Sequence, residues 1–150
     1  MRHATKAQIK WAPWYEVDAP RLALEKKAMS TRFPQFTLRM LEDRNLAWFG
    51  KLESNNNNQY EIAVVYPPDF PTSPPAVYPV TPSIEVRDGR GNRLKHQYPD
   101  GHLCLYYPSD RTFQANTTAA TVVAVSAAWF FAYEYWLQSD KKHWPGPEAD

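Results

Sequence analysis

The chain has 150 residues, one cysteine and a formal net charge of +1, which fits one domain and provides no long basic stripe for nucleic-acid phosphates. The N-terminus lacks the continuous apolar core of a signal peptide, and no later stretch approaches the roughly 20 apolar residues that span a bilayer. We therefore expect a soluble, cytoplasmic protein that binds neither nucleic acid nor membrane and whose lone thiol forms no internal disulfide.

The N-terminal part divides into an arm and the start of the domain. Residues 1–17 contain two tryptophans and no clear period, so we expect an irregular arm whose aromatic side chains pack on a single domain of residues 18–150. Asp18 and Pro20 give a helix-start signal, and Pro34 ends the predicted helix. The apolar positions of this helix are Leu22, Leu24, Ala28 and Met29.

Three apolar stretches follow the first helix. Residues 36–40, 46–52 and 60–66 each contain apolar side chains in short runs or in alternation with polar ones, which predicts strands. The intervening residues 42–45 are polar, and residues 55–58 are four asparagines, a residue type that tolerates turn conformations. The simplest arrangement is an antiparallel meander.

The middle of the chain is rich in proline. Residues 67–82 contain seven prolines, which excludes a continuous helix or central strand and predicts an ordered, extended crossing. Ile84 and Val86 predict the start of a short strand, and residues 88–92, with two glycines, predict a turn. Residues 95–107, which hold a histidine and cysteine cluster, are expected to be extended.

The C-terminal part changes to a helical period. Large apolar residues recur every three or four positions and predict a long helix over residues 118–139, whose aromatic residues Trp129, Tyr133 and Trp136 lie in the core rather than around a cofactor. The recurring residues are Val122, Val125, Trp129, Tyr133 and Trp136. Beyond them, Trp144 and Pro145 cannot extend the helix and should fold back as a loop.

The order of these elements and three local patterns resemble the ubiquitin-conjugating family. Tyr66-Pro67-Pro68-Asp69-Phe70-Pro71 followed by Pro74-Pro75 resembles its proline-rich stretch. His96 stands where the family has the histidine of its His-Pro-Asn motif, and Leu103-Cys104-Leu105 resembles its active-site sequence. His102-Leu103-Cys104-Leu105-Tyr106, the aromatic helix and the Trp144-Pro145-Gly146 ending are similar to the prokaryotic branch, including members encoded in CBASS anti-phage operons.

This resemblance covers roughly residues 20–148 and implies an α+β, ubiquitin-conjugating-like fold. It further implies that Cys104 forms a thioester with the C-terminus of a protein, similar to a cGAS-like nucleotidyltransferase (CD-NTase), and transfers it to an amine or another nucleophile. No cofactor or metal is expected. Because no adenylating domain is present, a separate activating enzyme is expected. The family's Pro-Asn is replaced by Gln97-Tyr98, so the asparagine thought to steady the oxyanion is absent.

The residues around the cysteine suggest how its chemistry would work. A free thiol has a pKa near 8.5 and needs an activating group. If the segment is extended, His102 and Cys104 share one face, so His102 would lower the pKa of the thiol or help to position the oxyanion, or would merely hydrogen-bond the backbone. His96 is expected to brace the loop. Tyr98 or His102 would support the oxyanion in place of the asparagine.

Further polar residues and other functions remain open. Asn116 is a remoter oxyanion donor, and Asp100 or Asp110 would help to deprotonate an attacking lysine or would simply lie in polar loops. The exposed prolines and Phe70 would form scaffold or a partner-binding edge. The basic side chains of a predicted turn would be solvated or would meet an acidic partner; they are Arg87, Arg90, Arg93 and Lys95.

Four alternatives compete with thioester transfer. Cys104 could be a small core residue. A metal site could draw on His96, His102, Cys104 and His143, although their spacing is unusual for zinc. A cysteine hydrolase would use Cys104 with a histidine, but its usual flanking sequence is missing. A non-catalytic module would keep the fold in order to bind a partner protein's tail.

Overall fold

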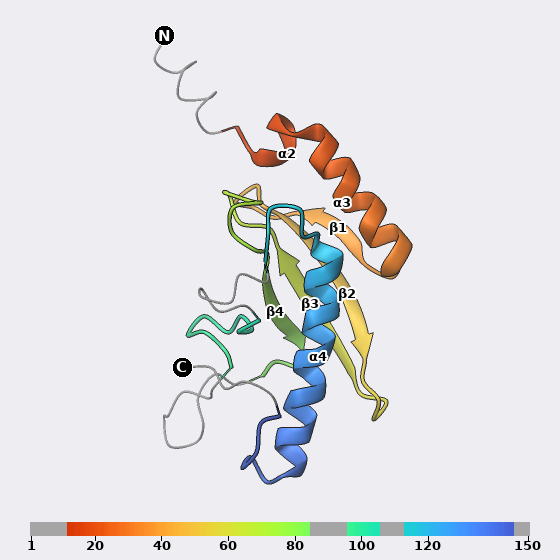
Figure 1. The fold of residues 1–150 in the computed structure, drawn as a ribbon, viewed down its shortest axis with the longest axis vertical. Helices are drawn as coiled ribbons and strands as arrows, with labels where there is room; N and C mark the ends of the chain where they lie inside the picture. Colours follow the sequence, from red (N-terminus) through yellow and green to blue (C-terminus); the bar gives the residue numbers. More distant parts are fainter. Residues whose placement is uncertain (1–11, 85–95, 106–112, 146–150) are drawn as a thin grey trace.

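The computed structural model describes residues 12–84, 96–105 and 113–145. Two helices, α2 (Trp14–Val17) and α3 (Ala19–Arg32), precede the sheet, and a long helix α4 (Ala119–Gln138) follows it. The strands are β1 (Thr37–Met40), β2 (Leu46–Glu53), β3 (Gln59–Val65) and β4 (Ala76–Thr81). This arrangement confirms the predicted α+β class and is compatible with a ubiquitin-conjugating-like fold (Figure 1).

The end of the predicted arm packs on the domain. Residues 14–17 form the short helix α2 rather than irregular chain. The Trp14 ring lies 5.0 Å from the ring of Tyr66 and 4.8 Å from that of Phe70, measured between centroids. The Tyr15 hydroxyl donates a hydrogen bond to the backbone oxygen of Arg44 at 2.9 Å. The aromatic packing is therefore confirmed for these two side chains, whereas residues 1–11 lie outside the described part and the boundary at residue 18 stays a prediction.

Helix α3 begins and ends where the sequence signals predict. The Asp18 carboxylate accepts a hydrogen bond from the backbone N–H of Arg21 at 3.1 Å, which caps the first turn. The predicted apolar face is wrong at one position, because Leu24 is 48% exposed while its neighbour Glu25 is fully buried.

Glu25 is buried because three partners satisfy its carboxylate. One oxygen accepts from the Tyr66 hydroxyl at 2.7 Å and from the backbone N–H of Ala119 at 2.8 Å. The other oxygen pairs with Nε of Arg21 at 3.1 Å. This one side chain therefore joins α3 to the end of β3 and to the first residue of α4.

The sheet has the order β1-β2-β3-β4, and every neighbouring pair is antiparallel. The predicted meander of the first three strands is confirmed. The predicted crossing is wrong at residues 76–81, which form the edge strand β4. The register shifts between Glu61 and Ile62, opposite Pro79, and an edge position with a bulge accommodates a proline that has no N–H to donate.

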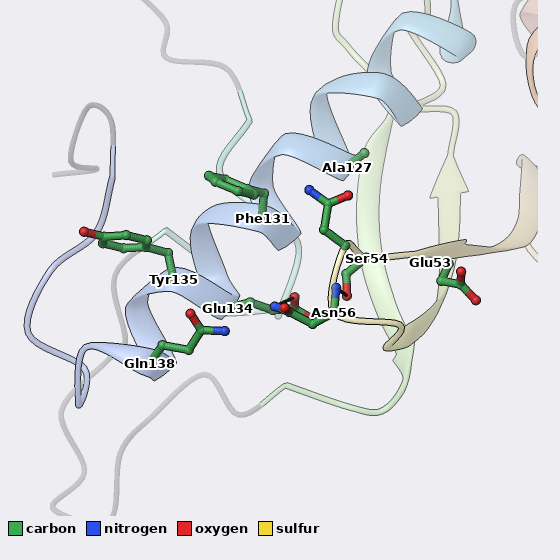
Figure 2. A pocket seen from close by; sticks show the side chains of 9 residues that line it. Glu53, Ser54, Asn56, Ala127, Phe131, Glu134, Tyr135 and Gln138 are labelled. Carbon is green, nitrogen blue, oxygen red and sulfur yellow. Dashed lines mark hydrogen bonds between the residues drawn. The ribbon is translucent and has the colours of Figure 1, made fainter.

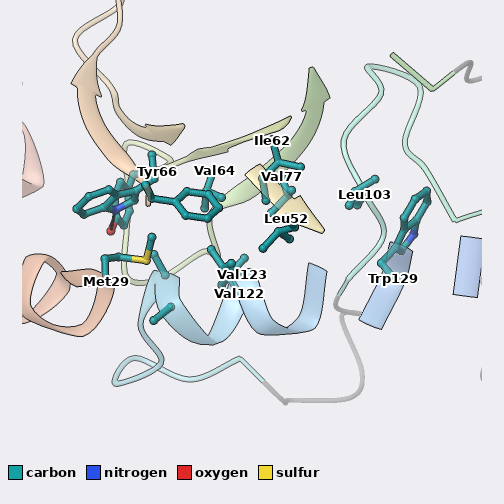
Figure 3. Close-up of a cluster of buried hydrophobic side chains, with 14 of the residues drawn as sticks. Met29, Leu52, Ile62, Val64, Tyr66, Val77, Leu103, Val122, Val123 and Trp129 are labelled. Carbon is teal, nitrogen blue, oxygen red and sulfur yellow. Dashed lines mark hydrogen bonds between the residues drawn. The ribbon is translucent and has the colours of Figure 1, made fainter. Parts of the chain in front are cut away.

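Helix α4 lies across one face of the sheet, and the core fills the space between them (Figures 1 and 3). Figure 3 shows Val122 and Val123 of the helix close to the strand residues Val64 and Val77. Further along α4, Phe130 stacks on Tyr60 of β3, with ring centroids 4.2 Å apart. These contacts confirm the predicted long helix.

The length and composition of helix α4 bear on the expectation that no segment of the chain could span a membrane. By length and composition alone it could cross a bilayer, with a mean hydropathy of 1.2 over its most apolar window, so the expectation that no stretch approaches that composition was wrong. However, 44% of that window is buried inside the domain, and the helix carries the buried carboxylate of Glu134. This pattern is typical of the core helix of a domain.

Candidate active site

The described part of the cysteine segment, residues 96–105, folds back on itself rather than running extended as predicted. Gln97 and Leu103 form an antiparallel bridge, and the N–H of Tyr98 donates to the carbonyl of His102 at 2.8 Å. A turn closes this loop, in which the N–H of Gly101 donates to the carbonyl of Tyr98 at 2.8 Å. Gly101 has a φ of 97°, a conformation that glycine adopts without strain.

Leu103 fixes the loop to the sheet. Its side chain is 2% exposed and belongs to the core, and its N–H donates to the carbonyl of Val77 in β4 at 2.9 Å. Because adjacent side chains of an extended pair of residues leave the backbone on opposite sides, His102 and Cys104 flank a residue that points inward. Both are intermediate in exposure, and Cys104 is a free cysteine. As a residue, Cys104 is therefore neither fully buried nor fully exposed.

His96 braces the loop from beneath. Its side chain is 4% exposed, and its ring stacks on Trp144 with centroids 3.8 Å apart and an interplanar angle of 9°. Its carbonyl accepts hydrogen bonds from Nε1 of Trp129 at 3.0 Å and from the N–H of Cys104 at 2.9 Å. The backbone of His96 has a φ of 72°, an uncommon conformation that these contacts hold in place.

The contacts of His96 match the bracing role predicted for it and add a residue that sequence reasoning missed. The loop after α4 was expected to fold back, and Trp144 does so, but its stacking on His96 was not foreseen. Stacking between a tryptophan and a histidine 48 positions apart leaves no local sequence signal.

His102 is held by a carboxylate. Its Nδ1 lies 2.5 Å from Oδ1 of Asp100, and the same oxygen accepts the backbone N–H of His102 at 3.1 Å. The other oxygen of Asp100 accepts the hydroxyl of Tyr78 at 3.0 Å. On its face, the His102 ring stacks on Tyr98 with centroids 4.1 Å apart. The sequence placed Asp100 in a polar loop or near an attacking lysine, whereas the structure makes it the partner of His102.

Asp100 is poised to be ionised. Partial burial works to raise its pKa, but the hydrogen bonds from the backbone and ring of His102 and from Tyr78 outweigh burial, so the pKa lies below the usual value. Burial, followed by the hydrogen bond to Asp100, raises the pKa of Tyr78, so this phenol remains a donor at neutral pH. An anionic Asp100 orients Nδ1 of His102 toward itself and leaves Nε2 for another partner.

A shallow hollow lies next to this pair. Its volume is about 80 Å³, and its walls come from the proline-rich segment and from the loop. They include Pro74, Pro75, Tyr98, His102 and Leu105. The loop thus brings two of the predicted site residues, Tyr98 and His102, to the wall of one depression.

Other predicted residues do not join this cluster in the described part of the chain. Asn116 lies exposed in the turn before α4, and the N–H of His143 donates to Oγ of Ser139. Phe70 is 2% exposed, so it is scaffold and not a partner-binding edge. Among the described residues, no three His, Cys, Asp or Glu side chains gather in a way that could hold a metal ion. Several further predictions lie outside the described residues; they concern Val86, Arg87, residues 88–92, Arg90, Arg93, Lys95, Tyr106 and Asp110.

Comparison with known proteins identifies the family. Residues 25–150 match the family E2-CBASS, described as "Type II CBASS E2 protein". The chain belongs to this family. A comparison with curated proteins finds no match. As an E2-CBASS protein, the chain has an E2-like role in CBASS anti-phage defence, with protein partners from that system.

Proposed function

We propose that this E2-CBASS protein is a thioester-forming conjugating enzyme of the cytoplasm. Cys104 would accept the C-terminal carboxyl group of a protein, which we infer to be the CD-NTase of the same defence system, and would transfer it to an amine. The observation that carries the proposal is the hydrogen bond between the Asp100 carboxylate and Nδ1 of His102, two residues before a free cysteine. The catalytic roles of Cys104, His102, Tyr98 and His96 remain predictions.

The first step loads the cysteine. A separate activating enzyme supplies the acyl group as an adenylate or thioester. The sulfur of Cys104 attacks the carbonyl carbon, so that a C–S bond forms and the bond to the leaving group breaks with its electron pair. His102, oriented by Asp100, takes the thiol proton through Nε2. Asp100 acts through His102 and is therefore a positioning residue.

The second step releases the acyl group. An amine nitrogen attacks the thioester carbon, a C–N bond forms, and the sulfur of Cys104 leaves as a thiolate. His102 has by then released the thiol proton to the first leaving group or to water, so it takes the proton lost by the amine and returns it to the Cys104 thiolate; no atom changes oxidation state. A thioester is already activated, so positioning supplies much of the remaining reduction of the barrier.

The oxyanion of both steps needs a donor in place of the missing asparagine. Tyr98 is the candidate, because it lies on the wall of the hollow beside His102 and carries a phenolic O–H. His96 contributes through its backbone. Its carbonyl accepts the N–H of Cys104 and so fixes the position of the Cys104 backbone from which the thiol projects.

Adduct formation tests the proposal. The purified protein is incubated with the CD-NTase and activating enzyme encoded beside it, and adducts are followed by non-reducing electrophoresis and mass spectrometry. We expect a reductant-sensitive adduct with the wild type, a reductant-resistant ester with Cys104→Ser, and none with Cys104→Ala. His102→Ala should slow transfer by about 100-fold, in the range of general acid–base catalysis.

The same experiment separates the proposal from its alternative, a non-catalytic scaffold that binds a partner's tail. The absence of the family asparagine favours that alternative, since Gln97-Tyr98 stand where the family has Pro-Asn. A scaffold would bind the partner equally well as wild type or as Cys104→Ser and would form no adduct with either. That outcome would overturn the enzymatic proposal.

A further inference from the structure

A second hollow lies away from the cysteine loop, between the β2–β3 turn and α4 (Figure 2). Its volume is about 260 Å³, and none of its lining residues belongs to residues 96–105. The turn contributes Glu53 and Ser54, and the helix contributes Phe131, Glu134 and Tyr135. Neither thioester transfer nor the tail-binding alternative uses this site.

Glu134 places a negative charge in the wall of this hollow. The side chain is buried, with 6% of the residue exposed, and accepts hydrogen bonds from the Tyr60 hydroxyl at 2.6 Å and from the side chains of Asn56 and Asn58 at 2.8 and 2.9 Å. Burial works to raise its pKa, but these hydrogen bonds, and one from Ser54, outweigh burial and lower it. The carboxylate is therefore ionised at neutral pH.

The charge of Glu134 has no cationic partner within the described part of the chain. The donors that reach it are all neutral, and the ion pairs formed by the described residues do not include it. Buried charges in proteins are normally paired, because neutral donors alone leave the net charge uncompensated. The exposed carboxylate of Glu53 adds a second negative group, and no lysine or arginine lines the hollow.

The rim of the hollow carries two aromatic side chains that the fold does not cover. Phe131 is 56% exposed and Tyr135 is 49% exposed. Both belong to α4, and apart from Ala127 the rest of the wall is polar. Exposed aromatic faces beside carboxylates favour a planar cation, which stacks on the rings while its N–H groups meet the oxygens.

We propose that this hollow binds an arginine side chain of a partner protein. The guanidinium group fits the negative charge of the wall and the aromatic rim together, whereas a lysine ammonium is compact, more strongly hydrated and lacks a planar face for stacking. The site is independent of the thioester chemistry. It gives the protein a docking point where α4 meets the β2–β3 turn.

The test uses small probes with a neutral isostere as the control. Backbone amide signals of the full chain are followed by NMR during titration with N-acetyl-arginine amide, N-acetyl-citrulline amide and N-acetyl-lysine amide. Citrulline keeps the shape of arginine but carries no charge. We expect saturable shifts with arginine at residues 53–56 and 127–138, none with citrulline, and binding at least about three-fold weaker with lysine.

Two exposed positions provide variants that should not disturb the fold. Glu53→Gln and Phe131→Leu are each expected to weaken arginine binding by about two- to five-fold. Cys104→Ala should bind the probe like the wild type, which keeps this result separate from that of the adduct assay. Equal shifts with citrulline, or no saturable shift with arginine, would overturn the proposal.

Discussion

Replacement of Glu25 should destabilise the protein more than most single substitutions, because its carboxylate connects three elements. It is fully buried and receives the Tyr66 hydroxyl, the N–H of Ala119 and Nε of Arg21. Arg21 is itself mostly buried, with 10% of its side chain exposed. In Glu25→Ala, two buried donors lose their acceptor and a buried guanidinium loses its counter-charge. We expect a loss of about 3–5 kcal/mol in the free energy of unfolding.

Glu25→Gln is the matched control, because the two carboxylate oxygens have different partners. Oε1 receives both Tyr66 and Ala119, so the amide oxygen of glutamine can keep these hydrogen bonds. Oε2 receives Arg21, and there the amide group presents N–H donors to another donor. We therefore expect an intermediate loss of about 1–3 kcal/mol.

Urea unfolding followed by tryptophan fluorescence measures both variants, with far-UV circular dichroism as a second probe of two-state behaviour. If Glu25→Ala cost less than about 1 kcal/mol, or if the glutamine variant lost as much as the alanine variant, the account of this buried network would be refuted.

Three further predictions concern other parts of the fold. A Cβ at Gly50 would lie 2.5 Å from Cγ of Phe36, so Gly50→Ala should cost about 1–3 kcal/mol in urea unfolding. Trp144→Ala should cost about 1–3 kcal/mol and accelerate alkylation of Cys104 by iodoacetamide, whereas Trp144→Phe should largely keep the stacking and the wild-type rate. Because the pKa of Glu134 is lowered by folding, its contribution is complete above the ordinary carboxyl pKa of about 4.3 and is lost as the pH falls through the lower folded value. In Glu134→Gln the free energy of unfolding should therefore fall less between neutral and acidic pH than it does in the wild type.

The elements that the sequence predicted best are those whose signals are local. Helix α4 follows from the spacing of its apolar residues, and α3 from Asp18 and Pro34 at its ends. Strand β4 was missed because Pro79 argues against a central strand, and only its pairing with β3 reveals an edge position. Local rules thus give the elements but not the pairings that make a proline tolerable.

The buried polar residues were harder to predict because their partners are distant in sequence. Glu25 contacts Tyr66, 41 positions away in the sequence, and Ala119, 94 positions away. The helical period alone therefore predicted that Leu24 is buried and gave no reason to bury Glu25. The asparagine run was predicted to be a turn, and residues 54–58 do form one. The hydrogen bonds from Asn56 and Asn58 to Glu134 could not be predicted, because they join residues more than 70 positions apart.

For the cysteine loop, the sequence indicated the candidate site but predicted the wrong conformation. The motif around Cys104 indicated the candidate site, and the family assignment agrees with the resemblance that the motif carried. The extended conformation was wrong, although Asp100-Gly101 is itself a turn signal that could have predicted the fold-back. That turn is what brings the Asp100 carboxylate to the ring of His102.

Two separate sets of contacts position the loop, and this division bears on the proposed chemistry. His102 is oriented from within the loop by Asp100 and Tyr98, while the backbone of Cys104 is tied through His96 to Trp129 of α4 and, by stacking, to Trp144. A change in the C-terminal aromatics should therefore move the sulfur relative to an imidazole that stays in place. Such a change should alter the reactivity of Cys104 before it unfolds the domain, because the sheet and α3 do not depend on these contacts.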